Sequence, residues 1–239
     1  QVDQTVKAHD GFLIYAGGDD VLALCPADEA LSLAQALRHA FQKETKSIAT
    51  DNEKPDASAG IAIAHFKSPL QDIIREAQAA EKRAKNDYGR SAFAVTLMKH
   101  SGETSHWGSK WESHALELYE AILKEMLTPD LSNKFPHRAC QLLTPYLTAQ
   151  TGISEQSNTI DADTGKSLIT REFEHAAIRQ GSKETAKKLL PSLESHLAHL
   201  PDDFQTQLKA LIGLCTTAAF VHRNIEAGKT QNTPQPANA

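Results

Sequence analysis

Two apolar runs, separated by four glycine and aspartate residues, constrain the fold more than any other feature of this sequence. The run Phe12-Leu13-Ile14-Tyr15 is followed by Gly17-Gly18-Asp19-Asp20, and a second apolar run occupies 21–25. Glycine and aspartate favour tight turns because they tolerate positive φ, so the pattern predicts a hairpin over 11–25. The turn of that hairpin would present two adjacent carboxylates.

The rest of the first hundred residues predicts a small α+β module. Apolar positions recur at helical spacing within 30–41 and again within 70–88, where Pro69 opens the second helix. Apolar strands are predicted at 58–65 and 91–98, after a polar loop over 45–57. We expect a largely antiparallel sheet with both helices on one face, giving a first domain over 1–100.

The second half of the chain predicts helices alone. Residues 101–110 are polar and read as a linker, and from 111 to 227 every apolar periodicity is helical, which predicts an all-α bundle. The last segment, 228–239, has two prolines and no aromatic residue, so we expect a disordered tail.

Composition excludes several classes of protein. The chain has 239 residues, 40% of them hydrophobic, and no apolar run long enough for a membrane span, so we expect a cytoplasmic protein of one or two domains. Its three cysteines include no Cys-x-x-Cys pair, which argues against a disulfide framework or a zinc knuckle. The net charge of -5 gives no basic stripe, so any nucleic-acid contact must be local or shared with partners.

The paired carboxylates suggest a metal site. Asp19 and Asp20 repel each other at close range, and a divalent cation would relieve that repulsion. Carboxylate oxygens suit Mg²⁺, which bridges them to substrate phosphates, and Gly17 and Gly18 would let a nucleotide approach the backbone. The alternative is that these four residues simply form a favourable hairpin turn.

Further motifs follow the hairpin in a characteristic order. They are Ser58-Ala59-Gly60-Ile61-Ala62, the helix end Glu81-Lys82-Arg83-Ala84-Lys85 and the turn Gly89-Arg90. This order resembles the palm of GGDEF-type nucleotide cyclases. Within that superfamily, the segments 15–24 and 64–70 resemble the large polymerase-like subunit of type III-B (Cmr-type) CRISPR effector complexes. The resemblance covers about residues 11–111, and the helical remainder is similar to that subunit's C-terminal domain.

The resemblance implies a function in RNA-guided antiviral defence. Such a palm joins ATP through 3′-5′ linkages into cyclic oligoadenylate when target RNA is bound, within a complex of other subunits and guide RNA. Asp19 and Asp20 match the acids that bind Mg²⁺ or Mn²⁺. The matching nucleotide-binding positions are Gly17, Gly18, Ser58, His65 and Lys85. A capping or core role for His65 stays open, and Arg90 lies one residue further from Lys85 than the cyclase spacing.

One departure from the family pattern bears on activity. A complete palm begins with a strand and a helix, whereas only ten residues precede Gly11. We therefore expect an incomplete ferredoxin-like or GGDEF-like palm, completed by an upstream polypeptide. Two functions follow: a cyclic oligoadenylate synthase palm, or a non-catalytic module that docks other subunits of the effector complex. A diguanylate cyclase is disfavoured because the turn ends in Asp-Asp.

Overall fold

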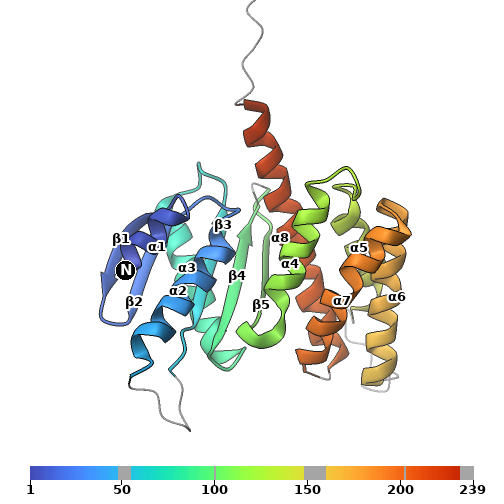
Figure 1. Cartoon of the computed structure of the whole chain (residues 1–239), viewed down its shortest axis with the longest axis horizontal. Coiled ribbons are helices and arrows are strands. Elements are labelled where there is room, and N and C mark those ends of the chain that lie inside the picture. Colours follow the sequence, from blue (N-terminus) through green and yellow to red (C-terminus); the bar gives the residue numbers. More distant parts are fainter. Residues whose placement is uncertain (48–54, 100, 148–159, 202, 232–239) are drawn as a thin grey trace, which may run out of the picture. The chain divides into compact units, whose positions relative to one another are not determined.

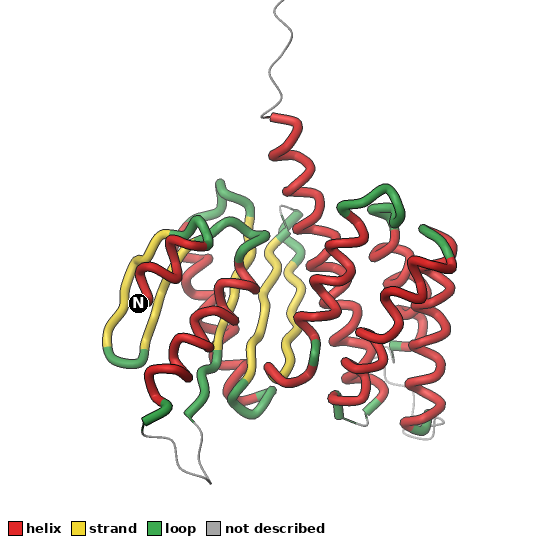
Figure 2. The backbone as a smooth tube through the Cα atoms, viewed as in Figure 1, coloured by secondary structure: helices red, strands yellow, loops and turns green. Residues whose placement is uncertain are grey.

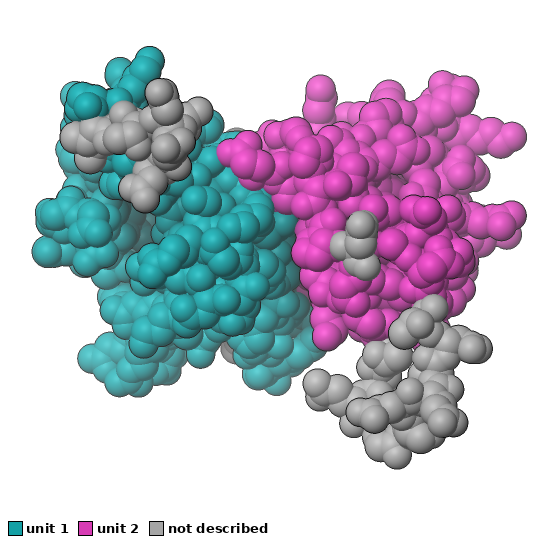
Figure 3. Space-filling view, turned by 90° about the horizontal axis from the view of Figure 1, so that it is seen from below, with its two compact units in different colours: residues 1–111 teal, residues 112–239 magenta. Residues whose placement is uncertain are grey.

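The computed structural model describes residues 1–47, 55–99, 101–147, 160–201 and 203–231. The chain divides into two compact units, unit 1 over 1–111 and unit 2 over 112–239, which are coloured separately in Figure 3. Among the described residues, no helix has the length and apolar character needed to cross a membrane.

Unit 1 mixes helices and strands, and the predicted α+β class is confirmed (Figure 1). Strands β1 and β2 form an antiparallel hairpin, and β3, β4 and β5 form a separate three-stranded sheet. In chain order the elements are α1 (Val2–Ala8), β1 (Phe12–Gly17), β2 (Asp20–Leu24), α2 (Ala30–Thr45), β3 (Ala59–Ala64), α3 (Leu70–Asn86), β4 (Ala92–Met98) and β5 (Thr104–Lys110).

The three-stranded sheet differs from the largely antiparallel sheet that we predicted. Strands β3 and β4 are parallel, with Gly60 opposite Ala94, because α3 carries the chain back along the sheet before β4 begins. Strand β5 then pairs antiparallel with β4 and occupies most of the segment predicted as a linker. Its sequence is polar except for the buried Trp107, so the alternation typical of a strand was too weak to recognise.

Helices α2 and α3 lie on opposite faces of this sheet, not on one face as predicted (Figure 1). A Cβ atom at Gly60 would lie 2.1 Å from the carbonyl oxygen of Ala77, so α3 packs directly on that face. The other face carries Phe93, whose ring centroid is 5.0 Å from that of Trp111. The guanidinium of Arg38 on α2 lies 5.4 Å from the Trp111 ring centroid, which places α2 on the Phe93 face.

A short helix precedes the hairpin, although the sequence was expected to lack one. Helix α1 contributes Val6, which is fully buried, and the backbone N–H of Gly11 donates to the Val6 carbonyl at 2.9 Å. This contact joins the end of α1 to the start of β1. The single buried apolar side chain in seven residues explains why no helical periodicity was visible.

Unit 2 contains only helices among its described residues, as predicted. Asp161 and Ser182 cap two of them, each accepting a hydrogen bond from the backbone N–H three residues on. The elements are η1 (Trp111–Ser113, beginning at the last residue of unit 1), α4 (Ala115–Met126), α5 (Phe135–Leu143), η2 (Thr144–Tyr146), α6 (Ala162–Gln180), α7 (Lys183–His199) and α8 (Phe204–Gln231).

Helix α8 continues to Gln231, so the first four residues of the predicted disordered tail are helical. The remainder of that predicted tail, 232–239, lies outside the described residues.

Candidate functional site

The Gly-Gly-Asp-Asp segment forms a tight two-residue turn between β1 and β2. Gly17 pairs with Asp20 across the hairpin, which leaves Gly18 and Asp19 as the central residues. Gly18 has φ of +62°, and nothing lies within 4 Å of the position its Cβ would occupy. A glycine at the first central position is what such turns favour, and it leaves the backbone open to solvent.

Both carboxylates of this turn are exposed. Asp19 lies at the tip, and Asp20 is the first residue of β2. The described residues contain no group of three histidine, cysteine or acidic side chains close enough to hold a metal ion. Two exposed carboxylates nevertheless fit Mg²⁺ or Mn²⁺, because such ions keep several waters and complete their coordination with substrate phosphates. The turn thus presents two candidate ligands for such an ion.

Strand β3 separates two of the predicted nucleotide-binding residues. Ser58 precedes the strand and His65 follows it, so six strand residues, about 20 Å of extended chain, lie between them. Figure 2 shows the β1–β2 turn at the same end of unit 1 as the start of β3, whereas the loop after β3 lies at the opposite end. The structure therefore brings Ser58, but not His65, to the end that carries the carboxylates.

The His65 side chain takes part in a local turn. Its Nδ1 accepts a hydrogen bond from the backbone N–H of Lys67 at 3.2 Å, and its carbonyl accepts one from the N–H of Ser68 at 2.8 Å. Its ring centroid lies 4.4 Å from that of Phe66. These contacts fit the capping role that the sequence left open for His65.

Lys85 lies in the last turn of α3, near the start of β3. The backbone of Glu81 packs against Gly60, and Lys85 lies one helical turn further on, at the end of α3 beside the start of β3. Its ammonium forms an ion pair with Glu81, with Nζ 2.5 Å from Oε1. A phosphate group would have to compete with this partly exposed pair, and ion pairs near the surface are weak interactions in water.

The turn after α3 contains a feature that sequence reasoning missed. Gly89, Arg90 and Ser91 all have positive φ, a conformation that costs free energy at the two non-glycine residues. The ammonium of Lys110 donates to the carbonyl oxygens of Gly89 and Arg90 at 2.6 and 2.7 Å. No signal marked Lys110, because it ends β5 in the segment that was predicted to be a linker.

The two tryptophans do not form a stacking surface. Trp107 and Trp111 are 2% and 5% exposed, and the Trp111 indole N–H donates to the Ala57 carbonyl at 2.8 Å. Both contact Phe93, with Trp107 edge-on at 5.4 Å between ring centroids. Base stacking on these two residues is excluded, because neither ring is accessible.

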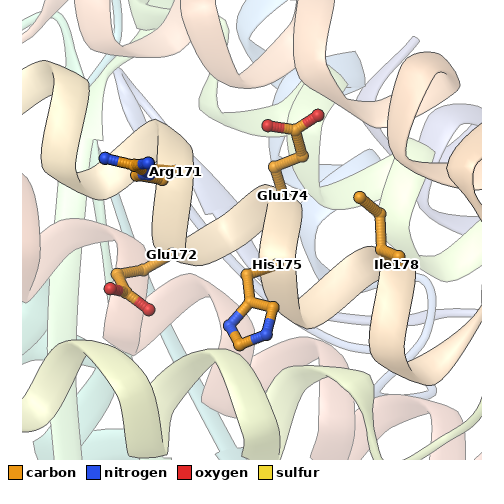
Figure 4. A pocket seen from close by; sticks show the side chains of 5 residues that line it. All are labelled: Arg171, Glu172, Glu174, His175 and Ile178. Carbon is orange, nitrogen blue, oxygen red and sulfur yellow. The ribbon is translucent and has the colours of Figure 1, made fainter.

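A shallow hollow of about 300 Å³ lies along α6 in unit 2 (Figure 4). Figure 4 shows that its side chains diverge, with Glu174 and Ile178 on one side of the helix and Glu172 and His175 on the other. The polar groups do not converge on a common point, as those of a ligand site usually do. The β1–β2 turn therefore remains the candidate site.

Comparisons with known proteins point to the same region. The profile of the family described as "Cas10/Cmr2, second palm domain" matches residues 1–94. A protein of Pyrococcus furiosus described as "CRISPR system Cmr subunit Cmr2" is 42% identical over 102 residues, which cover 41% of this chain and 11% of the relative. A protein of Saccharolobus solfataricus with the description "CRISPR system CMR subunit Cmr2" is 50% identical over 38 residues, 16% of this chain and 4% of the relative. The chain thus spans only a small part of the curated relatives it matches.

Proposed function

Because residues 1–94 belong to the family of Cas10/Cmr2 second palm domains, we propose that this chain acts in type III CRISPR antiviral defence. In this proposal it is the part of a large effector subunit that converts ATP into cyclic oligoadenylate when target RNA is bound. The observation that carries the proposal is the exposed turn that presents Asp19 and Asp20 within the matched region.

The reaction is a nucleotidyl transfer. The 3′-oxygen of one ATP attacks the α-phosphorus of another, a phosphodiester bond forms, pyrophosphate leaves and the hydroxyl proton passes to solvent. A divalent cation, when bound, supplies Lewis-acid activation and neutralises charge on the transferring group. Asp19 and Asp20 offer the oxygen ligands for it, and the open backbone at Gly18 lets phosphate groups approach the turn.

Ser58 and Lys85 complete the proposed site from the neighbouring sheet and helix. The Ser58 hydroxyl can donate a hydrogen bond to a phosphate oxygen. The Lys85 ammonium can leave its ion pair with Glu81 and bind a terminal phosphate instead. His65 does not enter this set, because it follows the far end of β3. Its predicted nucleotide contact could only concern a ligand at that other end.

The partners proposed for this chain are the other subunits of a type III-B complex, an upstream polypeptide that completes the palm, guide RNA and target RNA. The net charge of -5 favours RNA contacts shared with those subunits. A docking module without catalysis is the second candidate. It is favoured by the finding that no third acidic ligand accompanies the two carboxylates among the described residues.

The test is conversion of labelled ATP by a reconstituted complex with guide and target RNA and either Mg²⁺ or Mn²⁺. We expect oligoadenylate with the native chain and a loss of at least about 100-fold with Asp19→Asn combined with Asp20→Asn, since both ligands keep their shape but lose their charge. Asp28→Asn, which removes an exposed carboxylate from the loop after β2, is the matched control and should leave the rate unchanged. Intact assembly without product would support the docking candidate.

A further inference from the structure

The ring of Tyr15 lies over the glycine that begins the turn. A Cβ atom at Gly17 would be 2.3 Å from the Tyr15 hydroxyl oxygen and 2.7 Å from Cζ, so the ring extends along β1 towards the turn. Glycine is the only residue that leaves room for this arrangement. The Tyr15 side chain is nevertheless 56% exposed, which means that much of the ring is open to solvent.

The register of the hairpin places this ring on the same face as one carboxylate. Gly17 pairs with Asp20 and Tyr15 pairs with Leu22, so Tyr15 and Asp20 are diagonal neighbours on one face. Side chains in such positions are about 7 Å apart, within reach of an aromatic ring. An accessible aromatic surface therefore lies directly beside the candidate metal ligands.

An exposed ring at this place fits a nucleobase. Bases stack on aromatic side chains, and each such contact contributes roughly 1–3 kcal/mol with little dependence on the base. We propose that the base of the nucleotide whose phosphates are held at the turn stacks on Tyr15. This inference rests on the proposed function, since it assumes a metal–triphosphate at Asp19 and Asp20, and it assigns the base-binding surface of that site.

Binding experiments on the full chain test the proposal. Calorimetry with Mn²⁺ would compare ATP with inorganic tripolyphosphate, which carries the phosphates but no base. For the native chain we expect ATP to bind at least about ten-fold more tightly than tripolyphosphate, the ratio expected from one stacked base. Tyr15→Ala should remove this advantage and leave tripolyphosphate binding unchanged, whereas Tyr15→Phe should retain it.

Two further variants test whether the position of the Tyr15 ring matters, and not only the presence of an aromatic residue. Gly17→Ala keeps the tyrosine but displaces its ring from the turn, so it should weaken ATP binding while tripolyphosphate binding persists. Phe12→Ala is the matched control, because Phe12 is also an exposed aromatic residue of β1, 69% exposed, but lies at the end of the strand far from the turn. It should leave the affinity for ATP unchanged.

The outcomes are distinct. Equal affinity of the native chain for ATP and tripolyphosphate would overturn the role of Tyr15 but leave the metal–phosphate part of the proposed function standing. Absence of binding by either ligand would contradict both. If Phe12→Ala weakened ATP binding as much as Tyr15→Ala, the effect would belong to the whole apolar face, and the assignment of the base to Tyr15 would be wrong.

Discussion

The β1–β2 hairpin and strand β4 are both rich in apolar residues but are buried to very different extents. Every residue of β4 from Ala92 to Leu97 is buried, with helices on both faces of its sheet. In the β1–β2 hairpin no residue is buried, and Phe12, Tyr15 and Val21 are 69%, 56% and 42% exposed. Apolar composition therefore forms the core in one sheet and a surface in the other.

This difference indicates which part of unit 1 provides stability and which part provides a binding surface. Buried apolar strands carry the free energy of folding, whereas a large exposed apolar surface usually marks a place where something binds. The carboxylate turn belongs to the exposed sheet. The following substitutions test this division, and both tryptophans of the chain lie in unit 1, so their fluorescence follows its unfolding specifically.

The largest difference is expected between two phenylalanines. Phe93→Ala removes a fully buried ring from β4 and should lower the free energy of unfolding of unit 1 by about 3–5 kcal/mol. Phe12→Ala, in the exposed hairpin, should change it by less than about 0.5 kcal/mol. Denaturant titration monitored by tryptophan fluorescence measures both, and comparable losses would show that the hairpin also belongs to the core.

Two glycine-to-alanine substitutions compare the same two regions by adding a methyl group instead of removing a ring. Gly60→Ala places a methyl group 2.1 Å from the Ala77 carbonyl oxygen and 2.2 Å from the Glu81 nitrogen, so α3 must shift, at a cost of about 1–3 kcal/mol. Gly17→Ala meets only the end of the exposed Tyr15 ring, which can turn towards solvent, and should leave stability almost unchanged. Equal thermal unfolding temperatures for the two variants would contradict the close packing of α3 on β3.

A smaller effect is expected from a buried hydroxyl. Thr96 is fully buried in β4 and accepts a hydrogen bond from the Arg83 guanidinium, whose Nε has no hydrogen-bond partner. Thr96→Val should therefore cost about 1–2 kcal/mol, because the guanidinium loses its acceptor. Thr104→Val, at an exposed position of β5, is the control. Similar equilibrium denaturation curves for the two variants would show that solvent replaces the lost partner.

The smallest effect concerns pH. Desolvation, followed by the charge of Arg83, lowers the pKa of His106 on β5, while Glu76 acts in the opposite direction. The unfolded chain therefore binds a proton more readily, and unit 1 should lose stability as pH falls from above 6.5 through the folded-state pKa. The tryptophan-monitored stability of His106→Gln should depend less steeply on pH over this range. An unchanged slope would exclude this histidine as the cause.

Much of unit 1 was predictable from local pattern. The hairpin, helix α3 and the strands near 59–64 and 92–98 were expected within about two residues, because glycine, proline and apolar spacing mark them directly. Helix α2 was also expected, but it continues to Thr45, four residues beyond the predicted apolar spacing. The parallel pairing of β3 with β4 and the strand β5 were not predicted, since they depend on long-range contacts such as that between Phe93 and Trp107.

The candidate site was also predictable only in part. Asp19 and Asp20 were identified by the turn that carries them, and the turn is where it was predicted. The separation of Ser58 from His65 follows from strand β3 between them, and the strand predicted over 58–65 already indicated it. The position of Lys110 at the Gly89 and Arg90 carbonyls required two segments that are distant in the chain to meet.

Strand β3 has a consequence for handling the protein in solution. It ends the three-stranded sheet, and among the described residues no other strand pairs with its outer edge. Its six residues, Ala59–Ala64, include only glycine, alanine and isoleucine, without the charge or proline that usually protects such an edge. We therefore expect the isolated chain to self-associate increasingly with concentration. A partner that pairs with this edge should keep the chain in solution.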